Sequence, residues 1–241
     1  MSTRKSRPNV AFVVGHPDDV PISFGGTAWL LKDDYKLHVL CATKGERGYP
    51  STGSGPHPPS AEVGATRARE EAESCAILDA ELTFLGLIDG EVFADREVCQ
   101  QVADLLAGIK PVAVFTHGTF EKPDHSATFA ITMRALHMAK LFWTTELYVP
   151  AGTGSEYNNK TPDVYVNISA VIEEKRRLIG CHKRHAATPA DIEHWIEPNR
   201  FLGRMCWTDY AEAYVSGLPM MSERWRREAG SILMWLPARR A

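Results

Sequence analysis

The apolar run from Val10 to Val14, together with the residues that follow it, constrains this chain more than any other stretch. Such a run predicts a buried strand in a parallel sheet whose two faces are both covered by helices. It leads directly into Gly15-His16-Pro17-Asp18-Asp19, which places one imidazole and two carboxylates beyond the strand. Ligands of open α/β sheets bind at the carboxyl ends of the strands, so we expect a functional site here.

Patterns typical of strands alternate with patterns typical of helices along most of the chain. Further strands are expected at 37–42, 82–85, 112–116, 146–149 and 164–168, and helices at 25–33, 61–78, 97–109, 126–139 and 173–183. This alternation predicts an α/β protein with a Rossmann-like three-layer fold, a mostly parallel sheet and right-handed crossovers. A C-terminal extension, about residues 190–241, is expected to pack on an edge of the sheet or in a subunit contact.

The length of 241 residues fits one domain over residues 9–241, preceded by a flexible tail at residues 1–8. The net charge of −3 gives no indication of nucleic-acid binding. The five cysteines are scattered without any C-x-x-C pair, which argues against disulfides and a cysteine zinc site. The sequence lacks a run of about 18 apolar residues and an apolar signal core, so we expect no membrane span and a cytoplasmic location.

Polar side chains follow four of the expected strands. They are His16 with Asp18 and Asp19, Glu46 with Arg47, Asp89, and His117 followed by Asp124 and His125. In a parallel sheet these residues would face one crevice. Two histidines and a carboxylate form a catalytic zinc set that leaves a fourth position for water. Because adjacent residues point in different directions, one aspartate can bind the metal while the other takes a proton from the water.

Each of these residues also has a structural interpretation. Asp18, Asp19 and Asp124 could cap helices, and Asp89-Gly90 could form an ordinary turn. Arg67 and Glu70 could form a solvated pair on one helix, and Glu46-Arg47 could form a loop salt bridge. His117 could be a hydrogen-bonded structural histidine, and His182 could lie on the surface.

Several motifs resemble those of one known family. The segment VGHPDDVPISFGGT at 14–27 closely resembles the opening motif of the PIG-L/LmbE-like de-N-acetylases, zinc enzymes that remove acetyl groups from N-acetylated amino sugars. Further similar motifs follow in order at 43–46, 67–70, 85–90, 123–125, 175–182 and 210–213. The resemblance covers about residues 9–215.

The resemblance implies a role for individual residues. His16, Asp19 and His125 would bind Zn²⁺, and Asp18 would be the general base. Arg67 and Asp89 would hold substrate hydroxyls, and Glu46, His117 and His182 are further candidates for substrate binding. A His/Asp/His set also accepts Mn, Fe, Co or Ni. The resemblance further implies a small amino-sugar substrate and allows a homo-oligomer, either a trimer or a hexamer.

Two positions depart from the family pattern. Lys122 stands where the H-P-D-H motif usually begins with a histidine that assists catalysis. Lysine can donate a hydrogen bond and a charge from a longer stem, so Lys122 is a candidate catalytic residue. Alternatively, His117 or His182 takes over the role, or the activity differs. Pro21 replaces a residue that is often acidic, and we interpret it as a first-turn proline.

The sequence therefore predicts a zinc-dependent hydrolase that removes the N-acetyl group from an N-acetylglucosamine-type sugar or conjugate. One alternative is an amidase that acts on a non-acetyl amide, such as a thiol conjugate. Another is a non-catalytic member of the fold that binds a metal or a sugar. Lys122 favours the non-catalytic alternative, whereas Asp18 argues against it because a pure binder needs no base.

Overall fold

The computed structural model describes residues 7–48, 57–119, 122–151, 161–217 and 233. Within these residues a seven-stranded sheet has the order β3-β2-β1-β4-β5-β7-β6. Its strands are β1 (Asn9–Val14), β2 (Lys36–Thr43), β3 (Ala80–Leu87), β4 (Ala113–Thr116), β5 (Glu146–Pro150), β6 (Val164–Asn167) and β7 (Ala211–Ser216). Its helices are α1 (Asp19–Leu31), α2 (Ala61–Ile77), α3 (Arg96–Ile109), α4 (Pro123–Met138), α5 (Ile172–Ile179) and α6 (Pro189–Met205), with a 3₁₀ turn at Ser169–Val171.

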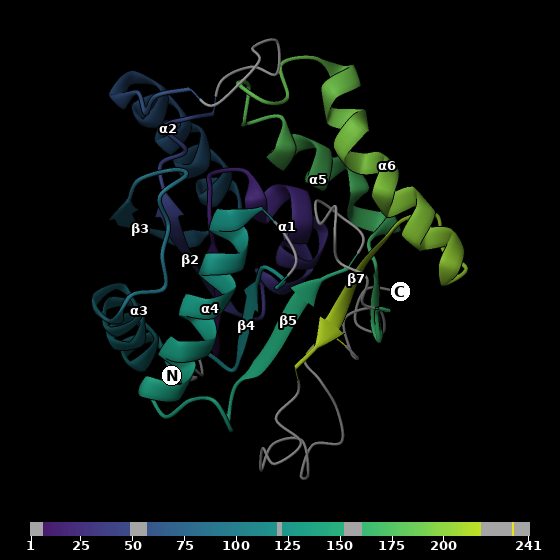
Figure 1. Ribbon diagram of the computed structural model, residues 1–241. Helices are drawn as coiled ribbons and strands as arrows, with labels where there is room; N and C mark the ends of the chain where they lie inside the picture. The colour runs from purple at the N-terminus through teal and green to yellow at the C-terminus, as the bar shows by residue number, and fades with distance from the viewer. Residues whose placement is uncertain (1–6, 49–56, 120–121, 152–160, 218–232, 234–241) are drawn as a thin grey trace, which may run out of the picture.

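Helices cover both faces of the sheet, so the fold is the predicted three-layer α/β arrangement (Figure 1). Alternate residues of β1 point to opposite faces. Phe12 and Val14 join a core cluster with residues of α1 and α5, whereas Ala11 and Val13 join a second cluster with residues of α3 and α4. The two-sided burial explains why the strand is apolar at every position from 10 to 14.

The site lies where the strand order reverses. β1 pairs in parallel with β2 on one side and with β4 on the other, and Val13 is opposite both Leu40 and Thr116. The chain moves outward in one direction from β1 to β2 and β3, and in the other from β4 to β5. The segments that follow β1 and β4 therefore start side by side, which is where open α/β sheets bind ligands.

The first helix begins earlier than the sequence suggested. Its expected start was Gly25, but α1 begins at Asp19 and contains both glycines of the pair. A Cβ added at Gly26 would lie 2.6 Å from Cγ2 of Ile168, so this glycine allows α1 to pack closely on the segment after β6. Close packing is one of the roles that glycine serves inside an element.

Two elements of the C-terminal part were not predicted from the sequence, namely α6 and β7. β7 is antiparallel to both of its neighbours and lies between β5 and β6. The fully buried Glu212 interrupts its apolar pattern. The flexible tail expected at residues 1–8 and the C-terminal extension expected at about 190–241 are only partly described. Residues 1–6, 218–232 and 234–241 lie outside the described residues.

A buried ion pair joins α1, α5 and β7. The ammonium of Lys175 donates to Oε1 of Glu212 at 2.7 Å and to the carbonyl of Ile22 at 2.8 Å. The carboxylate also accepts the backbone N–H groups of Gly26 and Thr27, at 2.9 and 2.8 Å. Because these partners satisfy the buried charges, the network fixes α1, and with it Asp19, against the C-terminal elements.

Replacing Lys175 by methionine should destabilise the protein by about 3–5 kcal/mol, because Glu212 would remain buried without its counter-charge. Urea unfolding at neutral pH measures this loss, with Lys183→Met at an exposed position of the following turn as the control. A loss no larger than that of the control would show that Lys175 does not stabilise the fold.

Candidate active site

The segment after β1 is built around a constrained aspartate. Asp18 precedes the first residue of α1 and has a φ of 91°, in the left-handed region that non-glycine residues rarely adopt. Next to it, the N–H of His16 donates to Oδ2 of Asp19 at 2.7 Å, which closes the turn. A backbone conformation of this kind costs on the order of 1–3 kcal/mol and is found preferentially at functional sites.

Three potential metal ligands converge beside this turn. Nδ1 of His16 lies 3.1 Å from Nε2 of His125, and that nitrogen lies 3.4 Å from Oδ1 of Asp19. The His125 ring comes from the first turn of α4, and one ligand atom from each of the three residues lies within 4.8 Å of the others. Two imidazole nitrogens and a carboxylate oxygen match the ligand types of a three-residue zinc site. The sequence predicted these same three residues.

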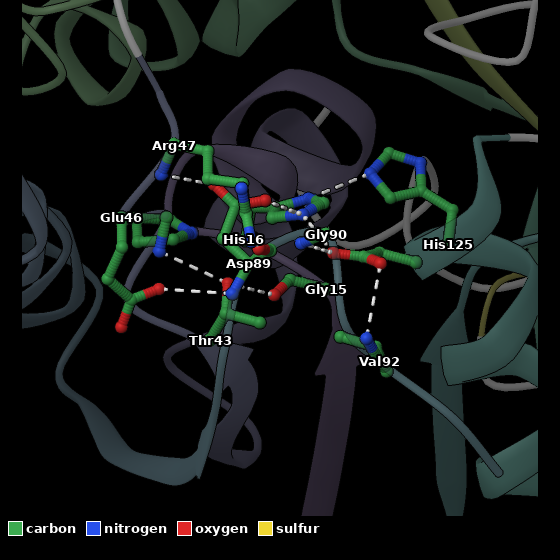
Figure 2. A network of polar contacts seen from close by, with 12 residues as sticks. Gly15, His16, Thr43, Glu46, Arg47, Asp89, Gly90, Val92 and His125 are labelled. Atoms are coloured by element: carbon green, nitrogen blue, oxygen red, sulfur yellow. Dashed lines mark hydrogen bonds and ion pairs between the residues drawn. The ribbon is translucent and has the colours of Figure 1, made fainter. Parts of the chain in front are cut away.

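The opposite nitrogen of His16 faces two carboxylates. Its Nε2 lies 3.1 Å from Oδ2 of Asp124 and 3.2 Å from Oδ1 of Asp89. Burial alone would lower the pKa of His16, but Asp124, Asp89 and Asp19 raise it to about 10. Carboxylates behind a metal-binding histidine commonly fix the orientation of its ring. Figure 2 shows His16 between His125 and the segment that carries Asp89.

Glu46 supports Asp89 and does not contact His16 directly. Its Oε2 accepts the N–H of Asp89 at 3.2 Å, and the N–H of Arg47 donates to Oδ2 of Asp89 at 2.9 Å (Figure 2). The salt bridge between Glu46 and Arg47 that the sequence allowed is replaced by these two contacts to Asp89. The structure therefore places Asp89 and Glu46 in one network behind His16.

The side chain of Asp18 points toward two donors. Its Oδ2 lies 3.0 Å from a guanidinium nitrogen of Arg67 and 2.6 Å from Nδ1 of His185. Its backbone N–H donates to Oε2 of the buried Glu71 at 3.0 Å. Burial raises the pKa of Asp18, but Arg67 and His185 outweigh that effect and hold the pKa below its usual value. These two partners therefore favour the ionised form of Asp18.

Arg67 lies almost entirely inside the protein. It donates to the carbonyls of Pro17 at 2.6 Å and Gly45 at 3.3 Å, in addition to Asp18. A side chain at Gly45 or Gly48 would overlap the guanidinium, so the segment after β2 is shaped around it. The sequence predicted that Arg67 holds substrate hydroxyls. In the described residues its contacts are with Asp18 and with the carbonyls of the segments after β1 and β2, and the substrate role stays a prediction.

The model of the GlcNAc-PI de-N-acetylase family, PIG-L, matches residues 11–136, which include the entire His16, Asp18, Asp19 and His125 arrangement. The chain belongs to the PIG-L family.

Two curated relatives of this PIG-L protein carry deacetylase names. A probable N-acetyl-α-D-glucosaminyl L-malate deacetylase 2 of Bacillus cereus is 26% identical over 83% of this chain and 93% of its own length. A diacetylchitobiose deacetylase of Thermococcus kodakarensis is 27% identical over 84% of this chain and 81% of its own length.

A solved structure with another activity shares the fold. The 4-carboxy-2-hydroxymuconate hydratase of Pseudomonas putida superposes with a TM-score of 0.68 at 22% identity, over 89% of this chain and 98% of the hydratase. The fold alone therefore does not identify the reaction. In the described part of this PIG-L chain, no helix is long and apolar enough to cross a membrane.

The remaining predicted site residues of this PIG-L member have different surroundings. His117 is buried, with Nε2 3.1 Å from Oδ2 of Asp19 and its ring stacked on His125 at 3.8 Å between centroids. His182 is also buried, with Nε2 3.6 Å from Oε2 of Glu71, and burial lowers its pKa to about 4. Lys122 is exposed and precedes the first residue of α4. Its backbone therefore leads directly into the turn that carries His125.

Two residues of the network, Glu71 and His185, were missed by sequence reasoning. Glu71 contacts Asp18, and its spacing of four residues from Arg67 could have placed both on one helix face. Asp124 was expected at the crevice and lies there, against His16. His185 lies 167 residues from Asp18, and the local sequence carries no signal for their contact.

The pKa of Glu71 predicts a pH dependence of stability. Burial raises this pKa from 4.5 to about 8, so the neutral form is favoured in the folded state. Its contribution to stability is fully present below the unfolded-state pKa and is lost as the pH rises through the folded-state pKa.

Between pH 5 and 8, the unfolding free energy of the metal-free parent should therefore fall relative to that of Glu71→Gln, by up to about 1.4 kcal/mol per pH unit. Urea unfolding at several pH values measures the difference, and Glu73→Gln on the exposed face of α2 is the control. Parallel pH profiles for the parent and Glu71→Gln would contradict the raised pKa.

Proposed function

We propose that this protein is a zinc-dependent de-N-acetylase that acts on an N-acetylglucosamine-type sugar or conjugate. The observation that carries the proposal is the Asp18 carboxylate, held by Arg67 and His185 and directly next to Asp19 of the His/Asp/His set. A metal set alone would also suit a binding protein. A fixed, ionised base beside it is a requirement of hydrolysis.

His16, Asp19 and His125 would hold the ion, and their donor types suit Zn²⁺. When bound there, Zn²⁺ would polarise the acetyl carbonyl and lower the pKa of water. Asp124 and Asp89 keep Nδ1 of His16 directed at the site by holding its Nε2. His117 lies on the inner side of Asp19, with Nε2 3.1 Å from Oδ2, and the same nitrogen accepts the N–H of Gly15 at 3.0 Å.

Asp18 would take the proton of the attacking water and return it to the amine that leaves. Both of its described side-chain partners contact Oδ2. Among the residues that the structure describes, Oδ1 has no hydrogen-bond donor, so this oxygen is the one available for the proton. Lys122, an exposed residue three positions before His125, would supply a positive charge toward the oxyanion that forms on the acetyl group.

The relatives support the choice of substrate. The names of the Bacillus cereus and Thermococcus kodakarensis proteins both specify deacetylation of an N-acetylated glucosamine compound. The family model is likewise that of a GlcNAc-PI de-N-acetylase. We therefore propose the same bond, an acetamide on glucosamine, for this chain.

The test is acetate release from a panel of N-acetylglucosamine conjugates after chelation, with and without added Zn²⁺. Release that returns with Zn²⁺ supports the proposal, and the preferred conjugate would define the substrate. Stoichiometric Zn²⁺ binding without acetate release from any conjugate would contradict it. In that case, amine release from non-acetyl amides would separate an amidase from a binding protein.

Replacement of Asp18 by asparagine should leave Zn²⁺ binding within about twofold of the parent but lower kcat by about 10²–10⁴-fold, because the base is lost. Metal content by mass spectrometry and acetate release measure the two effects. Asp104→Asn, at an exposed position of α3, is the control for the loss of one carboxylate. A variant that turned over as fast as the parent would exclude Asp18 as the base.

A further inference from the structure

The turn between α5 and α6 carries His185, which contacts the candidate base Asp18 although the two residues lie 167 positions apart in the sequence. Nδ1 of His185 lies 2.6 Å from Oδ2 of Asp18, the shorter of the two side-chain contacts that this carboxylate makes. The His185 side chain is 27% exposed, whereas Arg67, on the same oxygen, is 4% exposed. His185 is thus the partner of Asp18 that reaches the surface.

The turn that carries His185 is tightly built. The N–H groups of His185 and Ala186 both donate to the carbonyl of His182, at 3.0 and 2.8 Å. Arg184 donates from Nε to the carbonyl of Gly48 at 3.2 Å, which ties the turn to the segment after β2. The side chains of His182 and Ala186 are buried. These contacts fix the backbone of the turn next to Asp18.

The proposed function also implies where the hydrogen of His185 lies. Asp18 acts there as an ionised base, and an ionised carboxylate only accepts hydrogen bonds, so Nδ1 of His185 would carry the hydrogen of this 2.6 Å contact. Two donors from separate parts of the chain, Arg67 on α2 and His185 before α6, then hold the same oxygen of Asp18. A carboxylate held at Oδ2 in this way cannot rotate freely, and Oδ1 keeps a constant direction.

We propose that His185 is a positioning residue for Asp18, whose Nδ1–H directs the free oxygen of the carboxylate toward the reacting water. This inference rests on the proposed function, in which Asp18 is the base. The other two histidines considered from the sequence suit this role less well. His117 contacts Asp19, and His182 contacts Glu71, and both side chains are at most 3% exposed.

The test uses two substitutions that place an amide N–H at different distances from the backbone. In His185→Asn the amide nitrogen occupies the position of Nδ1, whereas in His185→Gln it lies one bond further out. His185→Ala removes the donor, and His194→Ala on the exposed side of α6 is the control.

His185→Ala should lower kcat by about 10- to 100-fold, the equivalent of one hydrogen bond to a charged group, with KM and Zn²⁺ content within twofold of the parent. His185→Asn should recover much of the lost rate, and His185→Gln should recover less. A merely structural role would lower stability or metal content and would not depend on the position of the amide. Equal rates for the parent and His185→Ala would overturn the proposal.

A second measurement does not depend on turnover. In the ¹⁵N–¹H spectrum of the imidazoles, His185 should be protonated at Nδ1, and Asp18→Asn should shift this signal. A His185 protonated only at Nε2, or one unaffected by Asp18→Asn, would overturn the proposal even if the parent released no acetate. If the parent released no acetate but showed the expected Nδ1 signal, the result would contradict the proposed function and would leave the contact between His185 and Asp18 supported.

Discussion

The rest of the site depends on the burial of two adjacent carboxylates, Asp18 and Asp19. Two negative charges at neighbouring positions in the protein interior are costly unless each has its own positive or hydrogen-bonding partners. The structure provides two separate sets. Arg67 and His185 contact Asp18, whereas His117 and His125 contact Asp19. The left-handed backbone of Asp18 sends the two side chains in different directions and so keeps the sets apart.

These partners come from four parts of the chain. The positions of the two carboxylates therefore depend on the packing of several elements. Arg67 lies on α2, His117 follows β4, His125 begins α4, and His185 lies in the turn before α6. The carboxylates themselves begin α1, which Lys175 and Glu212 attach to α5 and β7. A shift of α1 would therefore change the distances from both aspartates to their partners. The buried ion pair, although it lies outside the site, preserves the geometry on which the chemistry depends.

Patterns that depend on local residues were predictable from the sequence. The apolar run in β1, the strand-ending Gly15 and the order of later strands were sufficient for the sheet and for a site at its carboxyl edge. The choice of His16, Asp19 and His125 came from the family resemblance. What could not be predicted depends on partners distant in the chain. Glu212 makes β7 look polar because its partner, Lys175, lies on another element. His185 likewise carries no local mark of its contact with Asp18.

Residues that share one prediction in the sequence differ in the protein groups that surround them in the structure. Arg67, His117 and His182 share the same prediction, contact with a substrate, which the structure does not test. Each is buried against a different protein group: Asp18, Asp19 and Glu71, respectively. Because a hydratase shares this fold, the layers of helices and strands do not determine the reaction. In this chain two side chains from separate elements, Arg67 and His185, hold Oδ2 of Asp18, so the protein itself fixes the orientation of this carboxylate.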